Sequence, residues 1–351
     1  MDRHPRSHAV RRRGAPLVGL AAAAALALAG CSAQGGSSGS GGAGAAGDGG
    51  QAPVAVATTT QLGSILDQVT TCAGASSATV MGPGDDPHDF SASSRQVADL
   101  TRAELVVSNG LGLEVGLQTA LDNASADGAR LLEVAEGVDP LPFGAHGDEE
   151  HGEEGHGEEG HGEHAEQGGH EGHDHGSLDP HFWMDVGRMA QAAELIGDEL
   201  AEATGDQQYA DCGTEVSGEL EGVDAEVREI LATIPEDRRT LVTDHDAYGY
   251  FSEAYDFEIA GVVIPGGSTD AEPSSGELAA LVAQMEQEGA DALVTEAGAN
   301  NGLITALSAE TGGEVPVVEL YEGAIGPEGS GAETYAEAMV LSARTLAEAL
   351  G

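Results

Sequence analysis

The chain has 351 residues, of which 40% are hydrophobic, and its formal net charge at pH 7 is −48. This length and apolar content suffice for one large or two medium globular domains, which excludes a fibre or a small disulfide scaffold. The negative charge argues against nucleic acid and anionic lipid as electrostatic partners and leaves cations as the natural ligands.

The first 31 residues are predicted to form a lipoprotein signal peptide. Five of the thirteen arginines precede position 14, and the apolar stretch that follows at 15–30 is too short for a comfortable membrane span. LAGC at 28–31 resembles the bacterial lipobox, in which Cys31 is lipidated and becomes the mature N-terminus. The Gly/Ser-rich residues 32–52 are predicted to be a flexible tether that separates this anchor from the folded part.

Beyond the tether, apolar runs alternate with amphipathic stretches, which predicts an N-terminal α/β lobe over residues 53–186. The predicted strands of this lobe are 53–60, 77–84 and 103–110, and its predicted helices are 61–69 and 93–102. The βαβ order of these elements indicates parallel strand pairing.

A histidine- and acid-rich insert, residues 146–176, interrupts this lobe. Its five-residue beat HGEEG fits neither a helix nor a strand, and it has almost no apolar residue to bury, so it is predicted to be a disordered surface loop. We expect its eight histidines to form an auxiliary, weak metal-binding loop, because each imidazole must be ordered when an ion binds. These histidines are His146, His151, His156, His161, His164, His170, His173 and His175.

A connecting helical region is predicted at 187–234, and a second α/β lobe at 235–351. The predicted strands of the second lobe are 239–246, 257–264, 290–298 and 315–320, and its helices are 274–289, 302–313 and 332–350. The simplest architecture is two lobes, each a mainly parallel sheet flanked by helices, joined by a long rigid helix. If Cys31 is lipidated, Cys72 and Cys212 are left as either a disulfide or two separate thiols, and their separation in sequence leaves both open.

Outside the signal peptide and the insert, only His88, His181 and His245 remain. Each has an aspartate one or two residues before it, and such a carboxylate orients a ligating imidazole by accepting its second N–H. His88 follows a predicted strand and His245 lies at the end of one, and open α/β sheets bind their ligands beyond the carboxyl ends of their strands. Three neutral imidazoles suit a borderline-soft ion such as Zn²⁺, with a fourth position for a carboxylate or water.

Six motifs strengthen this interpretation, because their order resembles that of a known family. GPGDDPHDFSAS, ELVVSNGLGLE, DPHFWMDV, DHDAYGYF, DAEPS and VPVVEL all occur between about residues 53 and 350. They resemble the solute-binding lipoproteins that deliver zinc or manganese to bacterial ABC importers, proteins with two α/β lobes and a rigid connecting helix. The resemblance implies that His88, His181 and His245 are the first three metal ligands. The third ligand, His245, resembles the zinc branch of the family, because manganese-type members tend to have glutamate at this place. The His/acidic insert also resembles the zinc branch.

The chain departs from this family at the fourth ligand. The family often has an aspartate shortly after the last strand, whereas this chain reads ELYEGAIG and has Gly323 at the matching place. Either Glu322, one residue earlier, or a water molecule can complete a tetrahedral zinc site. Glu296, at the end of a predicted strand, is expected to be a buried hydrogen-bond partner rather than a ligand.

The resulting expectation is a monomeric, non-enzymatic, high-affinity Zn²⁺-binding protein outside the cytoplasm, lipid-anchored to the cell membrane. It would deliver its cargo to the permease and ATPase of an ABC importer and bind no nucleic acid. A Mn²⁺-binding homologue is the alternative within this class. A zinc-dependent hydrolase is the alternative from another class, since three histidines and a water also form a catalytic site, but the chain has no HExxH motif. A third alternative is an extracellular zinc buffer that binds zinc with the insert alone, but this function would not explain the two predicted lobes.

Overall fold

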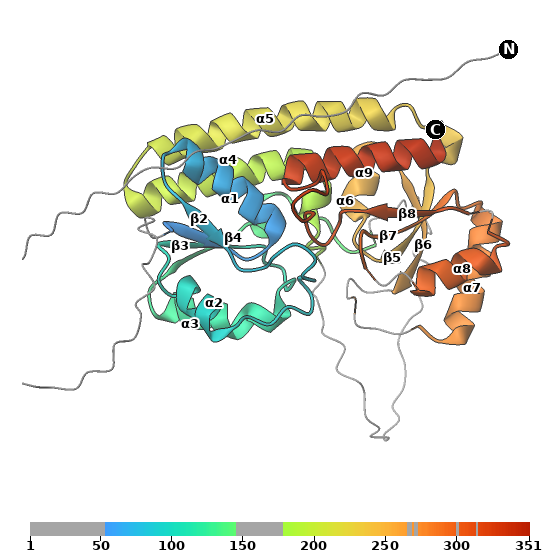
Figure 1. The fold of residues 1–351 in the computed structure, drawn as a ribbon, viewed down its shortest axis with the longest axis horizontal. Helices are drawn as coiled ribbons and strands as arrows, with labels where there is room; N and C mark the ends of the chain where they lie inside the picture. Colours follow the sequence, from blue (N-terminus) through green and yellow to red (C-terminus); the bar gives the residue numbers. More distant parts are fainter. Residues whose placement is uncertain (1–52, 145–177, 265–268, 270–272, 300–301, 314) are drawn as a thin grey trace, which may run out of the picture. The chain divides into compact units, whose positions relative to one another are not determined.

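The computed structural model describes residues 53–144, 178–264, 269, 273–299, 302–313 and 315–351, which all lie within one compact unit, Gly50–Gly351. The predicted signal peptide with Cys31, the tether and the histidine-rich insert lie outside the described residues. Within the described part, the chain forms two four-stranded sheets with helices around them, as predicted for an α/β protein of two lobes (Figure 1).

The first sheet has the strand order β2-β1-β3-β4, and all of its pairings are parallel. Its strands are β1 (Ala55–Ala57), β2 (Ser77–Thr79), β3 (Leu105–Ser108) and β4 (Arg130–Glu133), and its helices are α1 (Thr60–Cys72), α2 (Ser94–Leu100) and α3 (Gln118–Ala126). The central strands β1 and β3 are buried at every residue, as expected where helices cover both faces of a parallel sheet. The sequence patterns missed β4, because this edge strand has only two apolar residues and is half exposed.

The second sheet repeats this arrangement with the order β6-β5-β7-β8, again with parallel pairings. Its strands are β5 (Thr240–His245), β6 (Glu258–Ile264), β7 (Ala292–Glu296) and β8 (Val317–Leu320), and its helices are α6 (Gly249–Tyr255), α7 (Ser275–Glu288), α8 (Gly302–Glu310) and α9 (Tyr335–Leu350). A capping box, with Ser274 and Glu277 bonded reciprocally, begins α7. The carboxyl ends of β5, β7 and β8 meet at one edge of the sheet, which is where the polar residues gather.

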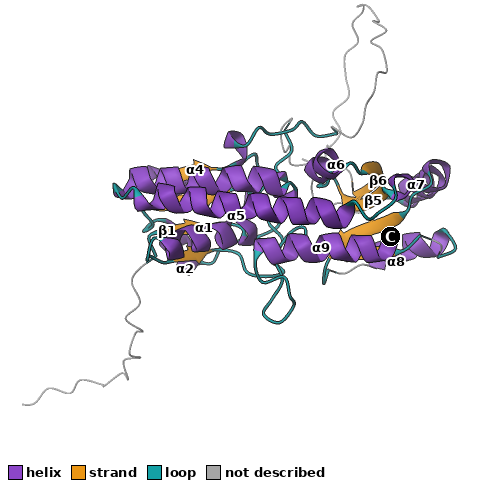
Figure 2. Cartoon of the chain, turned by 90° about the horizontal axis from the view of Figure 1, so that it is seen from above, coloured by secondary structure: helices purple, strands orange, loops and turns teal. Residues whose placement is uncertain are grey.

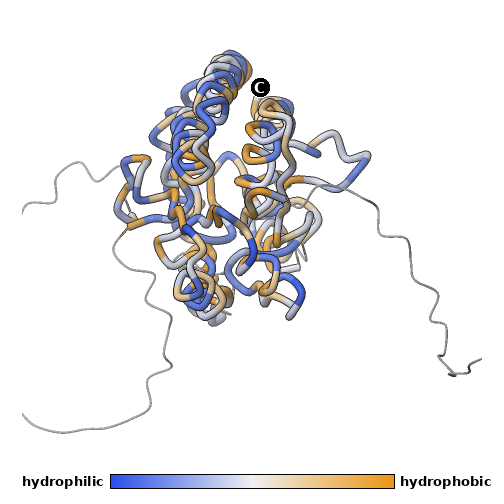
Figure 3. The backbone as a smooth tube through the Cα atoms, turned by 90° about the vertical axis from the view of Figure 1, so that its left-hand side faces the viewer, coloured by the Kyte–Doolittle hydropathy of each residue, from blue (hydrophilic) through white to orange (hydrophobic). Residues whose placement is uncertain are grey.

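The connecting region consists of two helices, α4 (Val186–Thr204) and α5 (Gln208–Leu231), which lie side by side (Figures 1 and 2). Gly205, with a φ of 76°, ends α4, because this left-handed conformation suits glycine and stops a helix. The 24 residues of α5 extend over about 36 Å at 1.5 Å per residue. Because α5 packs against α1 of the first lobe and α9 of the second, it is the long helix that links the lobes. Apolar and polar segments alternate along these helices, as expected for helices with one buried face (Figure 3).

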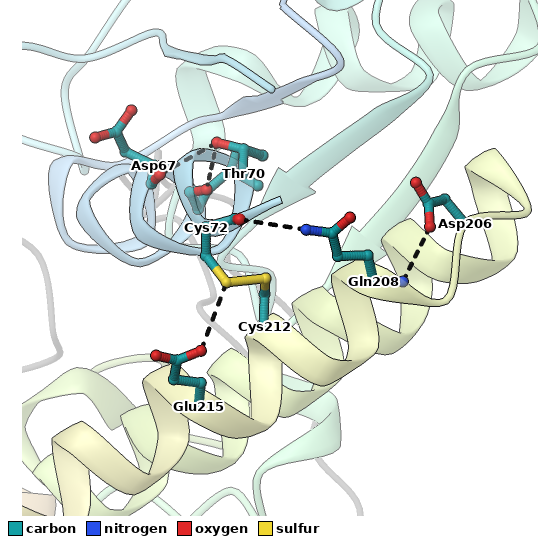
Figure 4. The surroundings of a disulfide bond; sticks show 8 residues. Asp67, Thr70, Cys72, Asp206, Gln208, Cys212 and Glu215 are labelled. Atoms are coloured by element: carbon teal, nitrogen blue, oxygen red, sulfur yellow. Dashed lines mark hydrogen bonds between the residues drawn. A yellow bond between two sulfur atoms is a disulfide. The ribbon is translucent and has the colours of Figure 1, made fainter. Parts of the chain in front are cut away.

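Cys72 at the end of α1 and Cys212 in α5 form a disulfide, with a Cα–Cα distance of 5.9 Å (Figure 4). The side-chain amide of Gln208 lies 3.5 Å from the main-chain oxygen of Cys72 and adds a hydrogen bond beside it. The covalent bond therefore ties the first helix of the first lobe to the helix that runs on to the second lobe.

Candidate metal centre

Three histidines from separate parts of the chain meet between the two lobes. His88 lies in the loop after β2, His181 precedes a short 3₁₀ helix ahead of α4, and His245 is the last residue of β5. One ring nitrogen from each lies within 4.8 Å of the other two, and Nε2 of His181 lies 3.2 Å from Nε2 of His88. Two nitrogens bound to one tetrahedral zinc ion at about 2.0 to 2.1 Å are separated by about 3.3 Å, so this spacing suits shared coordination.

Two of these imidazoles are oriented by the aspartates that precede them. Oδ1 of Asp179 lies 2.7 Å from Nδ1 of His181, and Oδ1 of Asp244 lies 2.9 Å from Nδ1 of His245. Because an ionised carboxylate only accepts hydrogen bonds, each interaction places the proton of the neutral imidazole on Nδ1 and leaves the lone pair on Nε2. Both rings are thereby prepared to offer Nε2 to a cation.

Glu322, which the sequence offers as an alternative to water for the fourth ligand, is buried and lies beside His245. Its Oε2 is 3.5 Å from Nε2 of His245, whereas Oε1 has no hydrogen-bond partner among the described residues. The compact donor cluster comprises the three histidines and does not include this carboxylate. Glu322 therefore adds a buried acidic group at one side of the cluster.

Glu296, at the end of β7, holds the backbone around Glu322. Its Oε2 accepts hydrogen bonds of 2.8 Å from the N–H groups of both Glu322 and Gly323, and its own N–H donates to Oδ2 of Asp244. One carboxylate thus links the carboxyl end of β7 to the segment after β8, while the amide of the same residue supports the aspartate behind His245.

The electrostatics of the site favour positive charge. Burial disfavours the imidazolium of His245, but the carboxylates of Glu322 and Asp244 outweigh it and raise the pKa of His245 to about 10. Burial, opposed by His245, raises the pKa of Glu322 to about 8. The carboxylates stabilise a cation at this place, and a divalent ion competes with protons for the same donors.

A cavity of about 440 Å³ opens beside His88 and His245, and its walls come from both lobes. Apolar side chains such as Val263, Leu303 and Ile325 form part of the wall. The carboxylates among its lining residues are Asp85, Asp86, Asp244, Glu296 and Glu322. The cavity provides a path by which a hydrated ion can reach two of the three imidazoles.

Two residues that the sequence patterns did not assign to the site hold the main chain of Glu322 in place. Gln61 in α1 and Trp183 next to His181 each donate a side-chain N–H to the main-chain oxygen of Glu322, at 2.8 Å. They join the first lobe to the segment after β8 across 261 and 139 residues. No local sequence signal predicts such pairs, although Trp183 is the only tryptophan of the chain.

Two parallel α/β sheets, a linking helix and a buried donor cluster between the lobes define a class, the solute-binding proteins that capture a metal ion for import. Residues 55–349 match the family model ZnuA, zinc-uptake complex component A, periplasmic, and the chain belongs to this family. Its members are non-enzymatic, extracytoplasmic binding components of metal ABC importers, which removes the hydrolase alternative.

Comparisons with individual relatives support the same assignment. The manganese-binding lipoprotein MntA of Halalkalibacterium halodurans is 29% identical over 281 residues, covering 79% of this chain and 82% of the relative. The zinc-binding protein TroA of Treponema pallidum is 28% identical over 277 residues, covering 77% and 80%. The solved structure of the periplasmic TroA from Treponema pallidum has a TM-score of 0.69 at 26% identity, over 86% of this chain and all of that one. Family membership thus establishes a metal-binding import component, and the names of the relatives divide between zinc and manganese.

Among the described residues, no helix is both long and apolar enough to cross a membrane. The proposed lipidation site Cys31 and the eight histidines of the insert lie outside those residues. The described residues on either side of the insert lie together, because Pro142 and Leu178 form an isolated antiparallel bridge. Next to that bridge, the ring of Phe143 lies 6.4 Å from the ring of His181.

Proposed function

We propose that this protein captures Zn²⁺ with His88, His181 and His245 and delivers it to the permease of an ABC importer. The observation that carries this proposal is the composition of the donor cluster, which consists of three buried imidazoles. Imidazole suits zinc, whereas manganese is better served by carboxylate, carbonyl and water oxygens. The donor set therefore favours zinc over manganese.

We propose Glu322 as the fourth ligand. It is buried, it lies next to His245, and its Oε1 has no hydrogen-bond partner among the described residues. A buried carboxylate oxygen without a partner is costly, and coordination to an ion removes that cost. A shift of the side chain toward His88 and His181 is required to complete the tetrahedron, since the carboxylate stands outside the compact cluster.

Manganese is the second candidate, and Glu322 is the observation that favours it. A carboxylate together with water adds the oxygen donors that manganese prefers, and MntA of Halalkalibacterium halodurans is named for manganese. The three imidazoles still outnumber that oxygen ligand, so zinc remains the proposed cargo.

The anchor and the insert complete the proposed function. Cys31 carries the lipid that holds the protein at the outer face of the membrane, and the insert 146–176 collects zinc ions weakly and raises their concentration near the centre. The bridge between Pro142 and Leu178 supports this role, because it joins the residues that flank the insert, and the ring of the neighbouring Phe143 lies 6.4 Å from that of His181. Replacing Cys31 with alanine should release the protein from membranes while metal binding is retained.

The direct test is metal analysis of protein purified without an affinity tag, followed by competition titration with zinc and manganese. We expect one tight zinc site, weaker manganese binding, and a loss of zinc affinity in His181→Ala well beyond the ten- to about hundredfold typical of residues that only support a ligand. Tight zinc binding that persists in His181→Ala contradicts the proposed site. Tighter binding of manganese than of zinc by the unaltered protein contradicts the proposed cargo.

A further inference from the structure

Tyr250 makes a hydrogen-bonded bridge between the two lobes. It lies in α6, five residues after His245, and is completely buried. Its hydroxyl accepts a hydrogen bond from the main-chain N–H of Leu141 at 2.9 Å and donates one to the main-chain oxygen of Asp179 at 2.7 Å. A side chain of the second lobe thus joins two segments that precede and follow the insert.

Asp179 is the residue that orients His181. Its Oδ1 accepts from the main-chain N–H of His181 at 2.9 Å and pairs with Nδ1 of the same residue at 2.7 Å. The N–H of Asp179 donates to the main-chain oxygen of Leu141 at 2.7 Å. Leu141, Asp179 and the hydroxyl of Tyr250 therefore form a closed set of hydrogen bonds directly behind the imidazole.

The aromatic ring of Tyr250 is also held in place by α4. The guanidinium carbon of Arg188 lies 5.0 Å from the ring centroid, a cation–π distance. Arg188 also donates to the main-chain oxygen of Val138 at 2.8 Å and to the carboxylate of Glu253 in α6 at 3.0 Å. These contacts fix the ring, so the position of the hydroxyl is well defined.

Burial raises the pKa of Tyr250 to about 12, more than its hydrogen bond with Leu141 lowers it. The hydroxyl consequently stays protonated at neutral pH and keeps its proton for Asp179. It acts as both acceptor and donor, which a phenolate cannot do.

We propose that Tyr250 is a positioning residue of the metal centre. Its hydroxyl holds the main chain of Asp179, and Asp179 in turn fixes the position of the His181 imidazole relative to that of His245. The ring centroids of these two histidines are 5.5 Å apart, and one of them, His245, is on the same lobe as Tyr250. The inference rests on the proposed function, because it requires His181 to be a ligand. It adds a residue that lies behind the donors and touches no ion.

Tyr250→Phe removes the bridging hydroxyl and keeps the ring, and Tyr248→Phe is its matched control. Tyr248 is two residues earlier, equally buried, and its hydroxyl has no hydrogen-bond partner among the described residues. We expect zinc affinity, measured by competition with a chromogenic chelator, to fall about tenfold in Tyr250→Phe, at the lower end of the range for residues that support a ligand. Affinity should be unchanged in Tyr248→Phe.

A double-mutant cycle with Asp179→Asn separates positioning from general destabilisation. If Tyr250 acts through Asp179, the effects of Tyr250→Phe and Asp179→Asn on zinc affinity are not additive. The absorption spectrum of the Co²⁺-loaded protein should also change in Tyr250→Phe, because the ligand field reports the arrangement of the donors. Additive effects, or an unchanged affinity and spectrum with only a lower melting temperature, overturn the inference and leave Tyr250 a structural residue.

His181→Ala keeps this test distinct from that of the proposed function. If His181→Ala abolishes tight binding and Tyr250→Phe does not weaken it, the positioning role is wrong and the site stands. If His181→Ala binds zinc normally, the proposed site itself is wrong, and the inference falls with it.

Discussion

The indole N–H of Trp183 donates a 2.8 Å hydrogen bond to the main-chain oxygen of Glu322, which lies 139 residues later in the chain. Trp183 is two residues from His181, so this bond fixes the backbone of the proposed fourth ligand next to one of the three histidines. The same oxygen also accepts from Gln61, so both of its lone pairs are used. The backbone of Glu322 is held firmly, and its carboxylate alone is left to adjust.

His245→Glu should shift the metal preference from zinc toward manganese. The variant exchanges one of three imidazoles for a carboxylate, the donor that manganese prefers. We expect the ratio of zinc to manganese affinity to fall about tenfold or more, equivalent to about 1.4 kcal/mol of differential binding. Paired titrations with the two metals measure this ratio, and His245→Gln, which has a similar shape and no charge, is the control. An unchanged ratio argues against the third donor as the determinant of cargo.

Glu322→Gln should weaken zinc binding, because a neutral amide oxygen replaces the carboxylate while the main-chain bonds of the residue are kept. Adding Gly323→Asp should restore part of the affinity. A Cβ at Gly323 would lie 3.8 Å from Oε2 of Glu296 and 3.9 Å from Cδ of Pro87, which are ordinary contacts, so there is room for the Cβ of the new residue. Calorimetry on the single and double variants checks the rescue. If Glu322→Gln binds zinc as tightly as the unaltered protein, water rather than Glu322 completes the site.

The stability gained from zinc should increase as pH rises. Charged groups around His245 raise its pKa from 6.5 to about 10 against the effect of burial, and burial raises the pKa of Glu322 from 4.5 to about 8. For both groups the pKa in the folded protein is higher than in the unfolded chain, so protonation stabilises the metal-free fold. This stabilisation is lost as pH rises, between about 4.5 and 8 for Glu322 and between about 6.5 and 10 for His245.

Zinc replaces those protons, so the melting temperature of the metal-loaded form should exceed that of the metal-free form by more at about pH 8 than at about pH 5.5. Melting curves of both forms across this range test the sign. A difference that narrows with rising pH is incompatible with proton competition at these donors.

Removal of the disulfide by Cys72→Ser with Cys212→Ser should lower the free energy of unfolding by about 2 to 5 kcal/mol. The bond spans 140 residues, and its loss frees a large loop in the unfolded chain. Zinc affinity should change little, because the bond joins α1 to α5 and not the segments that carry the three histidines. Chemical denaturation and zinc titration of the same samples separate the two properties. A large loss of affinity means that the link between α1 and α5 also shapes the centre.

Deletion of residues 146–176 should remove weak zinc sites and preserve the tight one. The bridge between Pro142 and Leu178 joins the residues that flank the segment, so we expect a short glycine linker to close the gap without moving Asp179 or His181. Titration should show a single tight equivalent in the deletion variant and additional weak equivalents in the full chain. Loss of the tight equivalent identifies the insert as the main binding element.

The sequence predicts the architecture well, because buried parallel strands such as 105–108 are continuous apolar runs and helices such as 186–204 have a regular apolar face. It also singles out His88, His181 and His245, since histidine is scarce outside the signal peptide and the insert. The hydrogen bonds of Gln61 and Tyr250 were not foreseen. They join residues 261 and 71 positions apart, and such pairings depend on how the lobes meet rather than on any local pattern.

The sign of the charges around the cavity determines the chemical form in which a metal can enter. Its described lining includes the exposed carboxyl groups of Asp85 and Asp86 and no arginine, and the chain contains no lysine at all. A complex that carries net negative charge, such as zinc with an excess of citrate, is repelled from this entrance, whereas the hydrated ion is attracted. The protein therefore competes with anionic carriers for the free ion instead of taking up the complex, and its rate of loading depends on how fast those carriers release their metal.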